Sequence, residues 1–146
     1  MKSSALFLLC CLMAAPAAGQ DLAQAESVFD QYQSRERAFD SSVADLYCDA
    51  AIIRNVRTYP GGQQRTLELP APKYKELIRA VMPLARAKGD YSTYSDVAFA
   101  PEATGFRITA TRYSVLKQYS SPISLLVGDC GGGTFGILEE LGQSQP

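Results

Sequence analysis

The sequence contains no histidine and no tryptophan among its 146 residues, and it has only four cysteines. Histidine is the usual general base near neutral pH and the commonest metal ligand, so its absence excludes Ser-His and Cys-His nucleophile pairs. A structural zinc ion takes four Cys or His ligands. Export would leave only two cysteines and no histidine, which is half of that number. The sequence therefore predicts no metal and no other cofactor.

Clusters of basic residues are also missing, since 14 Lys and Arg stand against 15 Asp and Glu, for a formal net charge of −1. Nucleic acid binding depends on clustered Lys and Arg that neutralise phosphates, so we expect no nucleic acid partner. A membrane-spanning helix needs about 20 apolar residues, and no stretch after the N-terminal segment has that length. We therefore expect no membrane insertion of the mature chain.

The first residues, 1–19, have the three parts of a cleavable secretory signal peptide. Lys2 supplies the positive start, an apolar run covers residues 5–14, and small residues follow over 15–19. We expect export and a mature domain over residues 20–146. Lipidation of Cys10 or Cys11 is the alternative, although neither cysteine follows the small residue that such an anchor normally requires.

Two cysteines, Cys48 and Cys130, remain after removal of the leader. In an oxidising compartment, a widely separated pair of this kind is a candidate disulfide. Two separate buried thiols are the alternative.

Hydrophobic periodicity predicts one α+β domain in the order α-α-β-β-α-β-β-β-β. Asp40 offers an N-cap for the second helix, and Gly89 offers a C-cap for the third. The Gly131-Gly132-Gly133 run is expected to form a hairpin loop. The expected elements are helices over 21–39 and 43–47, followed by strands over 50–59 and 63–69 that are joined by a turn at Pro60-Gly61-Gly62. A helix over 70–88 comes next, and Pro83 should bend or divide it near Met82. The last strands are expected over 91–100, 106–119, 123–128 and 134–141, with a break at Ser120-Ser121-Pro122.

The segment Leu46-Tyr47-Cys48-Asp49-Ala50-Ala51-Ile52-Ile53, together with the element order over residues 22–141, resembles the NTF2-like superfamily, which includes SnoaL-like and ketosteroid-isomerase-like proteins. Residues 89–92 and 107–116 resemble its secreted or periplasmic members, so the resemblance implies export to a bacterial periplasm. It also implies a cone in which a curved antiparallel sheet of about six strands wraps about three helices, leaves a pocket inside, and often pairs as a homodimer.

The isomerases of this superfamily use an Asp near the end of the first strand and a carboxylic acid on the penultimate strand. The resemblance places these positions on Asn55 and in residues 122–127, where Ser124 is the inward candidate and no acid occurs. We therefore expect a cavity without a proton-transferring side chain.

Arginines and tyrosines are the expected polar lining of this cavity, able to hold a small apolar or carboxylate-bearing ligand. The alternative for the strand arginines is a set of cross-strand ion pairs with Glu68, Asp96 or Glu139 on the solvent face. The candidate lining residues are Tyr47, Asn55, Arg57, Tyr94, Tyr113 and Ser124.

Four carboxylates in or beside strands remain candidate acid–base groups, because burial in an apolar cavity raises a carboxyl pKa: Asp49, Asp96, Glu139 and Glu140. Alternation along a strand points one of Glu139 and Glu140 inward, whereas Asp49 is expected to cap or pair at the helix–strand junction.

Three functions follow from these expectations. The first is a non-catalytic module that binds a small molecule or a protein in the cone. The second is a SnoaL-like isomerase, cyclase or hydratase with an unassigned acid–base residue. The third is a dimeric accessory subunit of an envelope complex. A fold alone does not choose among them.

Overall fold

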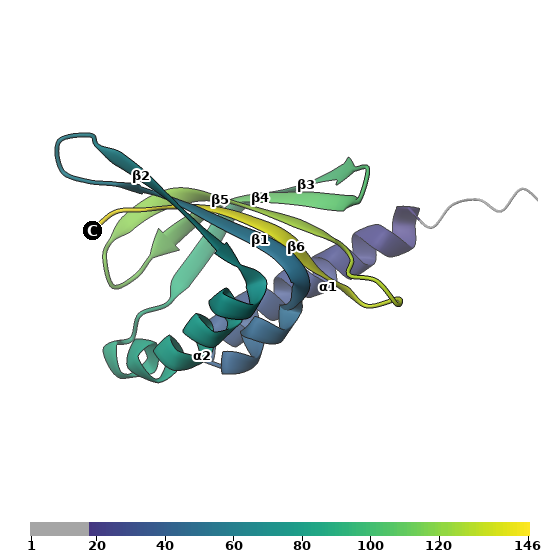
Figure 1. Cartoon of the computed structure of the whole chain (residues 1–146), viewed down its shortest axis with the longest axis horizontal. Helices are drawn as coiled ribbons and strands as arrows, with labels where there is room; N and C mark the ends of the chain where they lie inside the picture. The colour runs from purple at the N-terminus through teal and green to yellow at the C-terminus, as the bar shows by residue number, and fades with distance from the viewer. Residues whose placement is uncertain (1–17) are drawn as a thin grey trace, which may run out of the picture.

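The computed structural model describes residues 18–146, and residues 1–17 of the expected signal peptide lie outside the described residues. The described part of the chain forms nine elements (Figure 1). No helix among them is long and apolar enough to cross a membrane. The elements are α1 (Ala18–Arg37), the 3-10 helix η1 (Ser41–Leu46), β1 (Tyr47–Thr58), β2 (Gln64–Pro70), α2 (Ala71–Lys88), β3 (Ser92–Glu102), β4 (Gly105–Ser114), β5 (Tyr119–Asp129) and β6 (Phe135–Ser144).

The six strands form one sheet in the order β2-β1-β6-β5-β4-β3. All neighbouring pairs are antiparallel except β1 and β6, which run parallel. The sheet curves over α1 and α2, which lie together on one of its faces (Figure 1). This arrangement confirms the predicted α+β class, with one parallel pair that strand periodicity alone does not reveal.

The core fills the space between the concave face of the sheet and the helices. Ile108, Leu125, Val127 and Ile137 are its largest fully buried side chains, and they come from three adjacent strands. From α1, Phe29 packs on this layer with only 2% of its surface exposed. Burial of one such side chain contributes roughly 1.5–3 kcal/mol, so this layer holds α1 in place.

Both predicted helix caps are present. The Asp40 carboxylate accepts a hydrogen bond from the Ser42 amide at 2.8 Å and begins η1. Gly89 ends α2 in the left-handed conformation, with φ of 63°. The helix continues through Pro83 from Ala71 to Lys88, so the predicted division of this helix is wrong.

The turn between β4 and β5 lies earlier than the sequence predicts. The chain turns over residues 115–118, where Gln118 adopts φ of 57°, and not at Ser120-Ser121-Pro122. Pro122 lies inside β5, opposite Thr111, just before β5 begins to pair with β6 at Ile123. Proline has no backbone N–H to donate to a neighbouring strand, and it is tolerated here because it lies just before the pairing of β5 with β6 begins.

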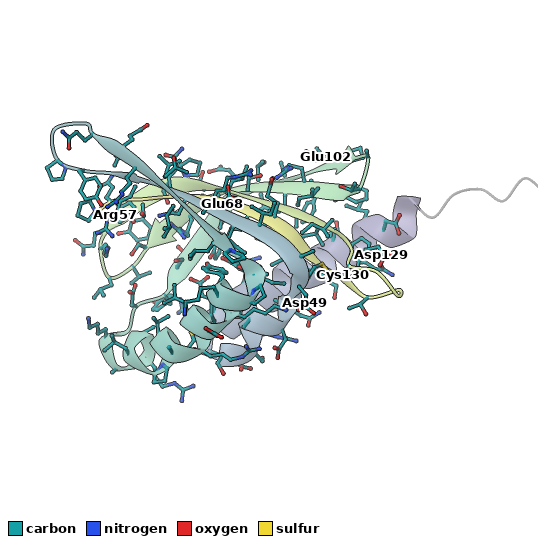
Figure 2. The ribbon with its side chains drawn as sticks, viewed as in Figure 1. Asp49, Arg57, Glu68, Glu102, Asp129 and Cys130 are labelled. Carbon is teal, nitrogen blue, oxygen red and sulfur yellow. A yellow bond between two sulfur atoms is a disulfide. The ribbon has the colours of Figure 1, made fainter. Side chains whose placement is uncertain are left out.

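Cys48 and Cys130 form a disulfide, with their Cα atoms 5.2 Å apart. The bond joins the start of β1 to the loop between β5 and β6, where Figure 2 labels Cys130. Gly136 lies against it, since a Cβ there would come within 2.8 Å of the Cys130 sulfur and 2.7 Å of the Leu46 carbonyl oxygen. A glycine is therefore required where β6 passes this crosslink.

Candidate functional site

A cavity of about 280 Å³ lies between the helices and the concave face of the sheet. One wall is apolar and comes mainly from α2. The other surfaces carry hydroxyl groups and charges from α1, β1, β4 and the following turn. The apolar wall consists of Val43, Ile78, Val81, Met82 and Ala85. An apolar wall with a few polar groups facing it is the usual composition of a small-molecule site.

Two tyrosines of the cavity wall share one buried carboxylate. Tyr47 at the start of β1 donates a hydrogen bond to Oε2 of Glu140 on β6, and Tyr74 on α2 donates to Oε1 at 3.2 Å. The Tyr47 and Tyr74 rings pack edge to face, with centroids 5.3 Å apart. Glu140 itself is only 4% exposed and does not line the cavity, so it lies behind the two phenols.

Burial raises the pKa of Glu140, and the tyrosine hydrogen bonds and the positive charge of Arg112 oppose that rise. Burial also raises the pKa of Tyr47 and of Tyr74 well above the ordinary phenol value, and the negative charge of Glu140 adds to the rise. The two phenols therefore stay protonated at neutral pH and remain hydrogen-bond donors to Glu140.

A second carboxylate, Glu36 near the end of α1, lines the cavity directly. Its Oε2 accepts a hydrogen bond from Tyr94 on β3. Burial raises the pKa of Glu36, while the Tyr94 hydrogen bond and the charge of Arg112 lower it. A carboxyl group in this setting can exchange a proton closer to neutral pH than a solvated one. The cavity wall therefore contains an ionisable acid, where the sequence predicted none.

Arg112 on β4 is the cation that faces both carboxylates. Its Nη2 donates to the main-chain oxygen of Gln143 at 2.7 Å and to Ser121 Oγ at 3.4 Å. Within residues 18–146, its other guanidinium nitrogens make no hydrogen bond. Lys117 and Asp90 also line the cavity, so its wall holds two cationic and two acidic side chains.

One of the six candidate lining residues, Tyr47, lines the cavity. Tyr94 does not line it, but donates a hydrogen bond to Glu36 and packs edge to face on Tyr32, and both of these residues do line the cavity. The structure does not bring the other four to the cavity. Asn55 donates to Ser144 Oγ at 2.7 Å near the end of β1, and Arg57 lies over the Tyr59 ring at the β1–β2 hairpin (Figure 2).

Tyr113 and Ser124 lie on the opposite face of the sheet from the cavity. Their strand neighbours Arg112 and Leu125 point inward, so alternation turns Tyr113 and Ser124 outward. Ser124 points outward because the buried positions of β5 are the odd-numbered residues from 121 to 127.

Several charged side chains form surface ion pairs, as the alternative interpretation of the arginines expects. Arg54 pairs with Glu68 at 2.7 Å, and Arg107 pairs with Glu139 at 2.6 Å. Asp49 pairs with Lys75 at 2.7 Å, which confirms its structural role. Glu139 thus points outward and Glu140 inward, as alternation requires.

Sequence reasoning missed Glu36, Arg112 as a cavity residue, and Tyr74. Glu36 stands between Arg35 and Arg37 in a polar run that resembles an exposed helix end. The available signal was the i, i+4 spacing of Tyr32 and Glu36, which places both on the same helix face. Only the position of β3 beside this face shows that the face is buried.

No protein-family model and no curated protein sequence matches the chain. Solved structures do share its fold. An NTF2-like protein of unknown function from Pseudomonas putida superposes with a TM-score of 0.64 and 9% identity, over 83% of this chain and 84% of that one. A candidate dehydratase of the NTF2-like family from Streptomyces avermitilis gives a TM-score of 0.58 and 11% identity, over 86% of this chain and 97% of that one.

A third solved structure with this fold is the beta subunit of a candidate aromatic-ring-hydroxylating dioxygenase from Novosphingobium aromaticivorans. Its TM-score is 0.58 at 8% identity, over 88% of this chain and 91% of that one. These likenesses confirm the predicted NTF2-like fold, which is also described as cystatin-like. Proteins with such different descriptions share it, so function has to be argued from the cavity.

Proposed function

We propose that this domain is exported and binds a small organic molecule in the cavity between α1, α2 and the sheet. The observation that carries the proposal is the cavity of about 280 Å³ with the Arg112 guanidinium in its wall. An engineered protein cavity of about 150 Å³ binds benzene. This cavity therefore has room for one substituted aromatic ring or an aliphatic molecule of similar size.

The polar end of the ligand is best matched by an oxygen-bearing group at Arg112, such as a carboxylate. Arg112 keeps donors that no residue of 18–146 uses, and its partly buried setting strengthens a charge-assisted hydrogen bond. Lys117 lies in the same wall, whereas Val81 and Met82 offer apolar contact to the ligand body. The expected apolar or carboxylate-bearing ligand fits this division of the walls.

Export rests on the leader sequence and on the disulfide. Cys48–Cys130 forms a crosslink of the kind that persists in oxidising compartments such as the bacterial periplasm. Mass spectrometry of the intact protein purified from its native host tests this directly, because it reports removal of the leader. The same measurement under native conditions reports a bound molecule and the expected homodimer.

Replacing Arg112 should weaken binding of a carboxylate ligand by about 10- to 100-fold, the usual effect of losing a hydrogen bond to a charged group. We would titrate benzoate into the protein by calorimetry and compare Arg112→Met with Arg57→Met. Arg57 is the matched control because it lies at the hairpin, outside the cavity wall. Equal losses in both variants, or no loss in Arg112→Met, would contradict the proposal.

Ala85→Phe, which adds a ring to the cavity wall, should weaken binding without removing a charge.

A second candidate function is acid–base catalysis, favoured by the position of Glu36 in the cavity wall. Its Oε2 accepts a hydrogen bond from Tyr94, and a hydrogen bond from the Ser92 side chain also lowers its pKa, so these two groups orient a carboxylate that lies in the cavity wall and can take a proton from a ligand. Proton abstraction can be followed by NMR as deuterium uptake into acetophenone in heavy water. Uptake that requires Glu36, and is lost in Glu36→Gln, would favour catalysis over binding alone.

A further inference from the structure

We propose that the Tyr47–Glu140–Tyr74 cluster recognises a hydrogen-bond donor, a hydroxyl or amino group, at the end of the ligand opposite its acidic group. The inference rests on the proposed function, because it concerns the same cavity. It narrows the ligand to a small aromatic or aliphatic acid that also carries a hydroxyl or amino group.

The direction of the tyrosine hydrogen bonds sets this preference. A phenol has one proton to donate, and Tyr47 and Tyr74 both give theirs to Glu140. Their oxygens can then only accept further hydrogen bonds. Both tyrosines line the cavity, so this part of the wall offers a ligand two acceptors and no donor.

The buried carboxylate strengthens the same preference. Glu140 accepts a hydrogen bond from each phenol and forms no ion pair among the described residues, so its side chain lies directly behind the two tyrosine oxygens. A ligand acceptor placed there, such as an ether or carbonyl oxygen, would meet only the lone pairs of the two phenol oxygens. A ligand donor would instead extend the chain of hydrogen bonds to Glu140.

The two polar regions depend on different positions of β6. Arg112 donates to the main-chain oxygen of Gln143, whereas the two tyrosines donate to the side chain of Glu140, three residues earlier. A strand advances about 3.3 Å per residue, so these two β6 residues are about 10 Å apart along the backbone. We expect a para-substituted benzene ring, with an acid at one end and a donor at the other, to reach both regions.

Calorimetry with matched acids tests the inference. At pH 7, 4-hydroxybenzoate and 4-aminobenzoate should bind about tenfold more tightly than benzoate, and 4-methoxybenzoate no more tightly than benzoate. Tyr47→Phe and Tyr74→Phe should each reduce the preference for the hydroxyl compound. Tyr113→Phe is the control and should keep it, since Tyr113 lies on the outer face of the sheet.

The outcomes separate this inference from the proposed function. Equal binding of benzoate, 4-hydroxybenzoate and 4-methoxybenzoate, still lost in Arg112→Met, would leave the binding site standing and overturn the donor preference. Preference for 4-methoxybenzoate would overturn it as well. Failure of every acid to bind would overturn both proposals. The four acids decide the question on the unmodified protein, so the result does not depend on whether the tyrosine variants fold.

Discussion

Removing the Cys48–Cys130 disulfide should lower the free energy of unfolding by about 4 kcal/mol. The two cysteines are 82 residues apart. In the chain-entropy account, a crosslink that closes a loop of this length restricts the unfolded chain by about that amount. The loss is a large share of the roughly 5–15 kcal/mol that stabilises an ordinary domain. The double substitution Cys48→Ala with Cys130→Ala, followed by urea unfolding, measures it.

Dithiothreitol supplies the control for this measurement. It should lower the urea midpoint of the unmodified protein and leave that of the double variant unchanged. A double variant as stable as the oxidised protein would contradict the prediction. Because Cys48 is 4% exposed, part of any loss in the variant also comes from the cavity left by its side chain, and the reduced unmodified protein separates the two effects.

Much of the fold could be predicted because the residues that begin or end its helices and strands act over a few neighbouring positions. Asp40 as an N-cap, Gly89 as a C-cap and Pro60-Gly61-Gly62 as a turn each act within a few residues. The β4–β5 turn was misplaced for the opposite reason. Residues 115–118 contain neither glycine nor proline, and Gln118 adopts its positive φ without a sequence signal.

The candidate site was much less predictable than the fold. Glu36 comes from α1 and Glu140 from β6, and nothing in either local sequence shows that both approach Arg112 on β4. Alternation could show only that one glutamate of the 139–140 pair faces inward. Which one does so depends on the register of β6 against its neighbours, where Glu140 lies opposite Ile53 and Leu125.

The buried glutamates should make the protein lose stability as the pH rises from mildly acidic to neutral. Burial raises the pKa of Glu140 and of Glu36 above their ordinary value of 4.5. A carboxyl whose pKa is higher in the folded state binds its proton more tightly there. Its contribution to stability is therefore complete below about pH 4.5 and is lost as the pH rises through the folded-state pKa.

Each group can contribute a slope of up to about 1.4 kcal/mol per pH unit inside that window. Asp40, Asp49 and Glu102 act in the opposite sense, because hydrogen bonds to their carboxylates lower the pKa of each one. Their stabilisation is present above their unfolded pKa and is lost as the pH falls through the folded one. The two sets titrate in separate ranges, so we expect maximum stability near pH 4–5.

Glu140→Gln should remove the part of the stability loss between pH 4.5 and 7.5 that comes from Glu140. Tyr47 and Tyr74 use different oxygens of Glu140, and glutamine replaces one of these oxygens with an NH2 donor, so the variant also loses about 1–3 kcal/mol at every pH. The slope of stability against pH is thus the informative quantity, measured by urea unfolding across this range. Glu139→Gln is the matched control: its side chain lies on the outer face and pairs with Arg107, so the slope should stay as in the unmodified protein. If Glu140→Gln kept the full slope, Glu140 would not be the group that resists ionisation behind the two tyrosines.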